Sequence, residues 1–207
     1  MELEFVATAT DAQRERLRGL VAAAEAGDGN AAVRVGDDYR LGQNGLRYSP
    51  RGAFCWYALG ALAGDATGQS NVGVCYEAGF GCPVDPDRSL AWYRWAAARK
   101  LGVAAFNVGS CYEDGRGVPA DNAEALAWYL IALERGWEPA AAKIARLAGA
   151  IPPGVRFEEV PGEGRLRRVK YAADAEQADG DDGFARDVTD QSLGTILIVG
   201  DETGWGD

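Results

Sequence analysis

Histidine is absent from this chain of 207 residues, and several other residue types are scarce. Without histidine, catalytic triads and dyads that depend on an imidazole cannot form, and a zinc site would need cysteine and carboxylate ligands alone. Only three lysines stand among the 21 basic residues, and the net charge is −10. Because of this charge, a surface that binds the phosphates of a nucleic acid is not expected. Because histidine is absent, a hydrolase centre that depends on an imidazole is not expected either.

Long apolar runs are also missing. No apolar segment approaches the length of about 18 residues that suggests a membrane-spanning helix. The start of the chain, MELEFVATATDAQRERLRGL, lacks a basic region followed by an apolar stretch, so no secretory signal is expected. These features predict a cytoplasmic location and no contact with a membrane.

Cysteine is present only at positions 55, 75, 82 and 111, without a Cys-x-x-Cys pair. We interpret all four as reduced, small apolar side chains, with a disulfide involving Cys55 or Cys82 as the alternative. No metal ion or other cofactor is expected.

The chain does contain a clear repeat. Leu-Ala-Trp-Tyr occurs at Leu90–Tyr93 and again 36 residues later at Leu126–Tyr129. Further residues recur at the same interval: Asn71, Val72, Gly73, Cys75, Tyr76, Glu77, Gly79, Gly81 and Asp85 return as Asn107, Val108, Gly109, Cys111, Tyr112, Glu113, Gly115, Gly117 and Asp121. An earlier copy includes Trp56 and Tyr57, which gives three copies. A fixed period in this range is typical of a stacked array of structural units.

Each unit reads as two helices. In the last copy, apolar residues at one-turn spacing predict helix A over 106–115, ending at Gly115. Asp121 and Glu124 predict a capping box for helix B, which carries the Trp-Tyr pair. Further helices are expected over 11–26, beginning at Thr10 with Gln13, and after Pro139. The eight helices predict an all-α fold, a right-handed α/α solenoid with A helices on its concave side.

The motifs resemble a known family. The order Leu/Val-Gly-x-x-Tyr, Gly-x-Gly-Val, Asp and Ala-x-x-Trp-Tyr is similar to the Sel-one-like repeat, a relative of the tetratricopeptide repeat, over about residues 22–149. The resemblance implies an adaptor that holds other macromolecules and does not catalyse a reaction. Gly79–Gly81 and Gly115–Gly117 are interpreted as turns, because neither follows a strand as a phosphate-binding loop would.

Residues 1–150 are expected to form the solenoid, 151–173 a β-hairpin turning at Pro161 and Gly162, and 174–207 an acidic tail. The tail contains ten acidic residues and one basic residue, so it holds −9 of the net charge of −10. Its last part includes Ile196–Val199 and Trp205. This apolar segment is interpreted as a third strand on the hairpin, a motif offered to a partner, or a ligand for the solenoid itself.

Two hypotheses of function follow. In the first, the concave face binds a protein or peptide, with paired asparagine amides holding its backbone. The candidate residues on this face are Arg34, Asp38, Asn71, Glu77, Asn107, Ser110 and Glu113. In the second, the chain is an immunity or inhibitor protein whose acidic tail covers a basic site on a toxin or nucleic-acid enzyme. An enzyme is not expected.

A second candidate surface lies on the B helices. Leu59, Trp95 and Ile131 each stand three residues after a repeated tryptophan. They form either an apolar docking stripe, covered by the tail with Trp205 or by a partner, or a part of the core between repeats.

Overall fold

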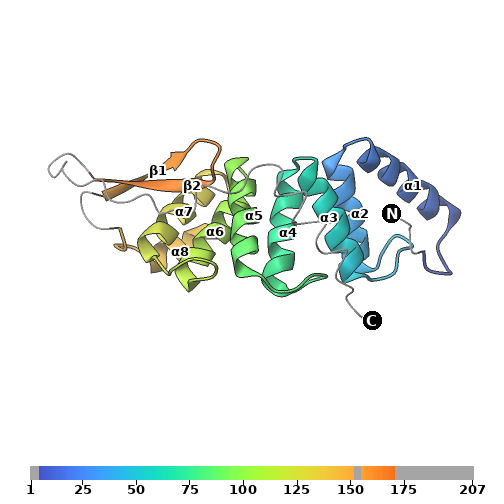
Figure 1. The fold of residues 1–207 in the computed structure, drawn as a ribbon, viewed down its shortest axis with the longest axis horizontal. Helices are drawn as coiled ribbons and strands as arrows, with labels where there is room; N and C mark the ends of the chain where they lie inside the picture. Colours follow the sequence, from blue (N-terminus) through green and yellow to red (C-terminus); the bar gives the residue numbers. More distant parts are fainter. Residues whose placement is uncertain (1–4, 152–154, 171–207) are drawn as a thin grey trace. The chain divides into compact units, whose positions relative to one another are not determined.

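The computed structural model describes residues 5–151 and 155–170, without the side chains of the last two, and its elements follow the repeat (Figure 1). Eight helices are present in this part of the chain: α1 Asp11–Glu25, α2 Gly29–Leu41, α3 Pro50–Leu62, α4 Ala66–Ala78, α5 Pro86–Ala98, α6 Gly102–Asp114, α7 Asn122–Glu134 and α8 Ala140–Arg146. Two strands follow, β1 Val155–Val160 and β2 Arg165–Lys170. The chain divides into two units, residues 1–170 and Tyr171–Asp207, and every described residue belongs to the first.

The helix boundaries come from local capping. Asp28, Ser49, Asp65, Asp85 and Asp121 each accept a backbone N–H of the first helical turn, and Thr10 with Gln13 forms the predicted capping box of α1. Helices α2, α4 and α6 end at glycines in the left-handed conformation, including Gly115 as predicted. These caps satisfy helix-end groups that water would otherwise have to bind.

Of the two hydrogen bonds in the capping box predicted for α7, one is present and the other is not. The carboxylate of Asp121 accepts the N–H groups of Ala123 and Glu124, as expected. The N–H of Asp121, however, donates to the carbonyl of Tyr112 on helix α6 rather than to Glu124. The backbone of the preceding helix therefore replaces the side chain that the sequence pattern favoured.

Consecutive helices pack against one another from α1 to α8, and α2 also contacts α4 of the next repeat. The repeated tryptophans and tyrosines form the core: Trp56, Trp92, Trp128, Tyr57, Tyr93 and Tyr129 are each at most 3% exposed. Since one helix pair cannot bury both of its faces, this continuous core stabilises the stack as a whole. The structure thus confirms the all-α repeat fold.

The glycine loops between the helices of a pair are turns, as predicted. Gly81 and Gly117 lie against the preceding B helix. An added Cβ would stand 2.2 Å from the carbonyl oxygen of Pro50 at Gly81, and 2.4 Å from that of Pro86 at Gly117. Both also have positive φ. Only glycine fits this close contact, which explains the Gly-x-Gly pattern.

The β-hairpin is present, with β1 and β2 antiparallel and Val160 opposite Arg165. Hydrogen bonds and packing contacts connect the hairpin to the B helices and to the residues that follow them. Glu159 accepts hydrogen bonds from Lys100, at 3.1 Å, and from Arg135. Leu166 packs on the core of the last repeat, and Gly164 lies directly against the backbone of Arg94. The hairpin is therefore attached to the last two repeats.

Candidate binding face

Each repeat joins its two helices by a tyrosine and a carboxylate. The hydroxyl of Tyr93 on α5 donates to Glu77 on α4 at 2.5 Å, and Tyr129 on α7 donates to Glu113 on α6 at 2.5 Å. In the first repeat Tyr57 donates to Asp37 at 2.7 Å, because Arg40 stands where the later copies have glutamate. Burial raises the pKa of Tyr129 to about 12 and that of Tyr93 above its ordinary value, so the phenols remain donors near neutral pH.

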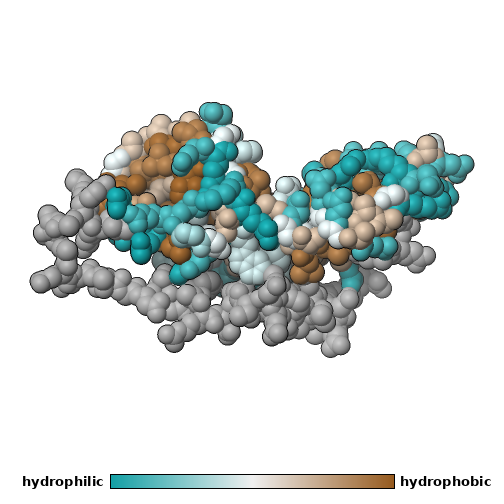
Figure 2. Space-filling model, turned by 90° about the horizontal axis from the view of Figure 1, so that it is seen from above, coloured by the Kyte–Doolittle hydropathy of each residue, from teal (hydrophilic) through white to brown (hydrophobic). Residues whose placement is uncertain are grey.

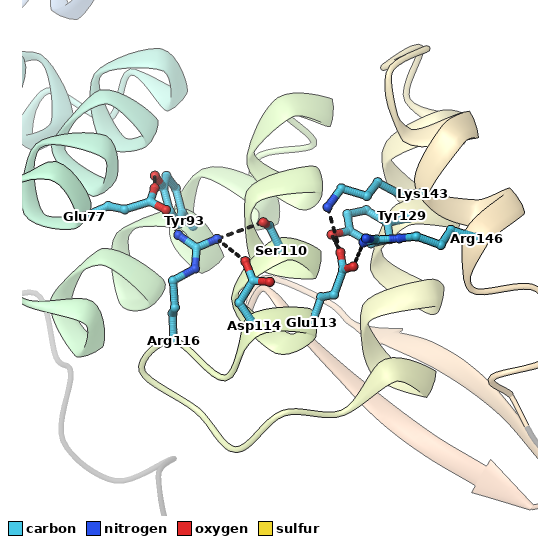
Figure 3. A network of polar contacts seen from close by, with 9 residues as sticks. All are labelled: Glu77, Tyr93, Ser110, Glu113, Asp114, Arg116, Tyr129, Lys143 and Arg146. Atoms are coloured by element: carbon cyan, nitrogen blue, oxygen red, sulfur yellow. Dashed lines mark hydrogen bonds and ion pairs between the residues drawn. The ribbon is translucent and has the colours of Figure 1, made fainter.

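Cations from later in the chain pair with the carboxylates of the second and third repeats (Figure 3). Arg116, in the loop after α6, forms an ion pair with Glu77 of the preceding repeat. It also donates to Ser110 at 2.8 Å and lies 3.3 Å from a carboxylate oxygen of Asp114. A single guanidinium thus links the A helices of the second and third repeats.

Helix α8 supplies the equivalent contact for the third repeat (Figure 3). Lys143 donates to Glu113 at 2.9 Å, and Arg146 forms a second ion pair with the same carboxylate, whose side chain is only 9% exposed. Lys143 also lies 5.7 Å from the ring centroid of Tyr129. The expectation from sequence did not include Arg116, Lys143 or Arg146. The repeat interval could have pointed to one of them, because Lys143 stands 36 residues after Asn107 and so occupies the same position of the repeat.

Three of the predicted partner-binding residues therefore already have partners inside the chain. Glu77 and Glu113 accept from tyrosines and pair with cations, and Ser110 accepts from Arg116. Their charges and hydrogen-bonding groups are largely used in holding repeats together.

Asp38 does not lie on an exposed face, which corrects the expectation from sequence. It is 3% exposed and occupies the position equivalent to Cys75 and Cys111, which are also buried. Arg16 of α1 pairs with it at 3.3 Å, and Asn44 donates to it at 2.6 Å. Helix α1 covers this position, because the first A helix has no preceding repeat to pack against.

Asn71 and Asn107 differ from these residues. Both are half-buried on their A helices, and no hydrogen bond joins either side-chain amide to another described residue. Arg34, at the equivalent position of α2, is exposed and forms no ion pair within the described part of the chain. These three side chains remain available on one face of the A helices, which we call the asparagine face.

The B-helix stripe is intermediate in exposure. Leu59, Trp95 and Ile131 are all half-buried. Trp95 packs edge-on against Trp92 with ring centroids 5.3 Å apart, and Ile131 packs on the core of the last repeat. Trp205 lies outside the described residues. In Figure 2, apolar surface gathers at the end of the molecule that carries α6, α7 and the hairpin, whereas hydrophilic surface predominates over α1.

A small cavity of about 40 Å³ lies between the second and third repeats, lined by Glu77, Pro86, Ser89, Cys111 and Arg116. It is far smaller than the several hundred Å³ typical of pockets for organic ligands. Within residues 5–151 and 155–170, no group of three or more cysteine or acidic side chains is arranged to hold a metal ion. The described helices include none that is long and apolar enough to cross a membrane.

In a comparison with known protein families, this chain matches the Sel1 repeat at residues 29–65, 66–101 and 102–137, which together make up just over half of the chain. A crystal structure of a Sel1 repeat protein from Oxalobacter formigenes is similar, with 32% identity, a TM-score of 0.58, and coverage of 63% of this chain and 98% of that one. No protein with a curated description matches the sequence.

A second similar structure is a protective antigen present in uropathogenic Escherichia coli strains, which displays the SLR fold. It is 31% identical with a TM-score of 0.57, and the match covers 60% of this chain but only 26% of the antigen. Proteins of Sel1 repeats generally act as scaffolds for protein–protein interaction and are typically not catalytic. With three matched repeats over more than half of its length, this chain belongs to the Sel1 repeat family.

Proposed function

We propose that this chain is a non-enzymatic adaptor that binds an extended segment of a protein or peptide on its asparagine face. The observation that carries the proposal is the contrast between Asn71 and Asn107, whose amides have no described partner, and the carboxylates of Glu77 and Glu113 on the same two helices, which are neutralised. An amide offers both a donor and an acceptor, as a peptide backbone does.

The spacing of the two amides supports this function. They occupy equivalent positions on α4 and α6, so the same contact is repeated along the stack. A bound backbone in an extended conformation presents its own donors and acceptors at regular intervals, which suits such a repeated contact.

Binding to a display of short random peptides tests the proposal. We expect the double variant Asn71→Ala, Asn107→Ala to lose peptides that the unchanged protein retains, with no change in its melting temperature. Asn122→Ala is the matched control, because Asn122 is an exposed asparagine on a B helix. Equal retention by the unchanged protein and the double variant would contradict the proposed role of the two amides.

The alternative, an inhibitor that covers a basic site on a toxin or nucleic-acid enzyme, rests on the charge of −9 in residues 174–207. Those residues lie outside the described part of the chain. In this case, binding to a basic protein would weaken steeply with added salt and would disappear when the chain ends at residue 173. The asparagine variants would leave it unchanged, which separates the two functions.

A further inference from the structure

The asparagine face continues into a fourth repeat position. Adding one repeat interval to Asn107 gives Lys143 on α8, so the row of equivalent residues is Arg34, Asn71, Asn107 and Lys143. Two uncharged amides therefore stand between two cations, each of which comes from a different end of the stack.

The two cations are not equivalent, because only one of them is neutralised. The ammonium of Lys143 donates to Glu113 at 2.9 Å and lies over the ring of Tyr129, as Figure 3 shows for its side chain. Arg34 is exposed and has no ion pair within the described residues.

The acidic residues near Arg34 on its own helix are already occupied. Asp37 accepts from Tyr57 and lies 3.5 Å from Arg40, and Asp38 is buried against Arg16. The positive charge of Arg34 therefore has no carboxylate to compensate it on α2. Among the described residues, a ligand lying along the row would therefore meet an uncompensated cation at one end only.

We propose that the ligand of the asparagine face is an extended peptide with a carboxylate that pairs with Arg34. This inference rests on the proposed function and adds the chemistry and direction of the bound segment. Packed helices are about 8–10 Å apart, and an extended chain rises about 3.3 Å per residue. The carboxylate thus lies about three residues from the backbone held by Asn71 and about six from that held by Asn107.

The carboxylate has two sources, an aspartate or glutamate side chain and the free end of a chain. The test uses two arrays of short random peptides, one with both ends blocked and one with free carboxyl ends, probed with the full-length protein. Enrichment of Asp or Glu at one position of the blocked peptides indicates a side chain. Enrichment only with free carboxyl ends indicates a chain terminus, and either result supports the proposal.

Variants of Arg34 give the decisive comparison. We expect Arg34→Glu to weaken binding of the acidic peptides about tenfold or more, and to favour peptides with Lys or Arg at the same position. Arg47→Glu is the matched control, because Arg47 is exposed outside the row and has no ion pair in the described part of the chain. Both variants should keep the melting temperature of the unchanged protein.

The outcomes separate the two proposals. Peptide binding that depends on Asn71 and Asn107 but shows no acidic preference, or a preference that Arg34→Glu leaves unchanged, would overturn this inference and leave the proposed function standing. Absence of any peptide binding that depends on the two asparagines would overturn both.

Discussion

Gly73 lies directly under the ring of Tyr93, so closely that a Cβ added at Gly73 would stand 2.6 Å from Cε1 of the tyrosine. The same contact occurs at Gly36 under Tyr57 and at Gly109 under Tyr129, with corresponding distances of 2.7 and 2.9 Å. The glycine allows the two helices of each repeat to approach, and this approach brings the tyrosine hydroxyl within reach of its carboxylate. A side chain at this position therefore disturbs both the packing and the hydrogen bond.

Replacing Gly73 with alanine is expected to destabilise the protein by about 1–3 kcal/mol, as overpacking of a close helix contact does. Gly19→Ala is the matched control, because Gly19 is helical and a Cβ there would meet nothing within 4 Å. The control should gain about 0.5–1 kcal/mol from helix propensity. Urea unfolding measures both values, and a Gly73→Ala variant as stable as the unchanged protein would contradict the contact.

Replacing Tyr129 with phenylalanine removes the neutral donor to Glu113 and leaves a carboxylate that is only 9% exposed with fewer partners. We expect a loss of about 1.5–3 kcal/mol, the usual range for a hydrogen bond to a charged group. Tyr48→Phe should have no effect, because Tyr48 is 63% exposed. A double-mutant cycle with Glu113→Gln measures the coupling, and independent effects of the two changes would show that the pair is not energetically linked.

Truncating the repeated tryptophans should be more severe. Trp92 and Trp128 are 3% and 0% exposed, so each change to alanine is expected to cost about 3–5 kcal/mol. Leu130→Ala, on the same helix as Trp128 but 44% exposed, provides a control with a much smaller loss. Thermal melting distinguishes these cases, and similar shifts for Trp128→Ala and Leu130→Ala would be inconsistent with a buried tryptophan row.

Alkaline pH should destabilise the fold through its thiols. Burial raises the pKa of Cys75, Cys82 and Cys111 to about 12, from an ordinary value of about 8.5. The folded chain keeps these protons where the unfolded chain has lost them. Their contribution is therefore complete below about pH 8.5 and falls progressively toward pH 12.

Urea unfolding between pH 7 and 11 measures this loss. Cys111→Ala should show a shallower decline than the unchanged protein, and an equal slope for the two proteins would argue against a contribution from this thiol. In denaturant, we expect all four cysteines to react with a thiol reagent. Two or fewer reactive thiols would instead indicate a disulfide.

The hairpin offers a further test. A Cβ added at Gly164 would stand 1.9 Å from the carbonyl oxygen of Arg94, whereas one added at Gly162 would meet nothing within 4 Å. Both glycines have positive φ, so each alanine variant bears a strain of about 1–2 kcal/mol per residue. Only Gly164→Ala should also detach the hairpin from α5, seen as faster hydrogen exchange of β1 and β2 amides. Equal exchange in both variants would mean that the contact does not hold the hairpin.

The sequence by itself determined the number of helices, most of their ends and the turn of the hairpin. These features depend on local chemistry: Asp85 caps its own helix, Gly115 ends one, and Pro161 with Gly162 lies between two alternating segments. The period also identified the buried Trp-Tyr pairs, because equivalent residues of a stacked array have equivalent surroundings.

Only the tertiary structure decided which polar residues remain available to a ligand. Arg116 reaches Glu77, and Lys143 reaches Glu113, across distances along the chain that no local pattern specifies. The sequence pattern predicts that Asp38 is an exposed acid on helix A, but α1 buries it beside Arg16. The choice among chemically similar side chains depends on which cation the neighbouring repeat places within reach, and that requires the packed stack.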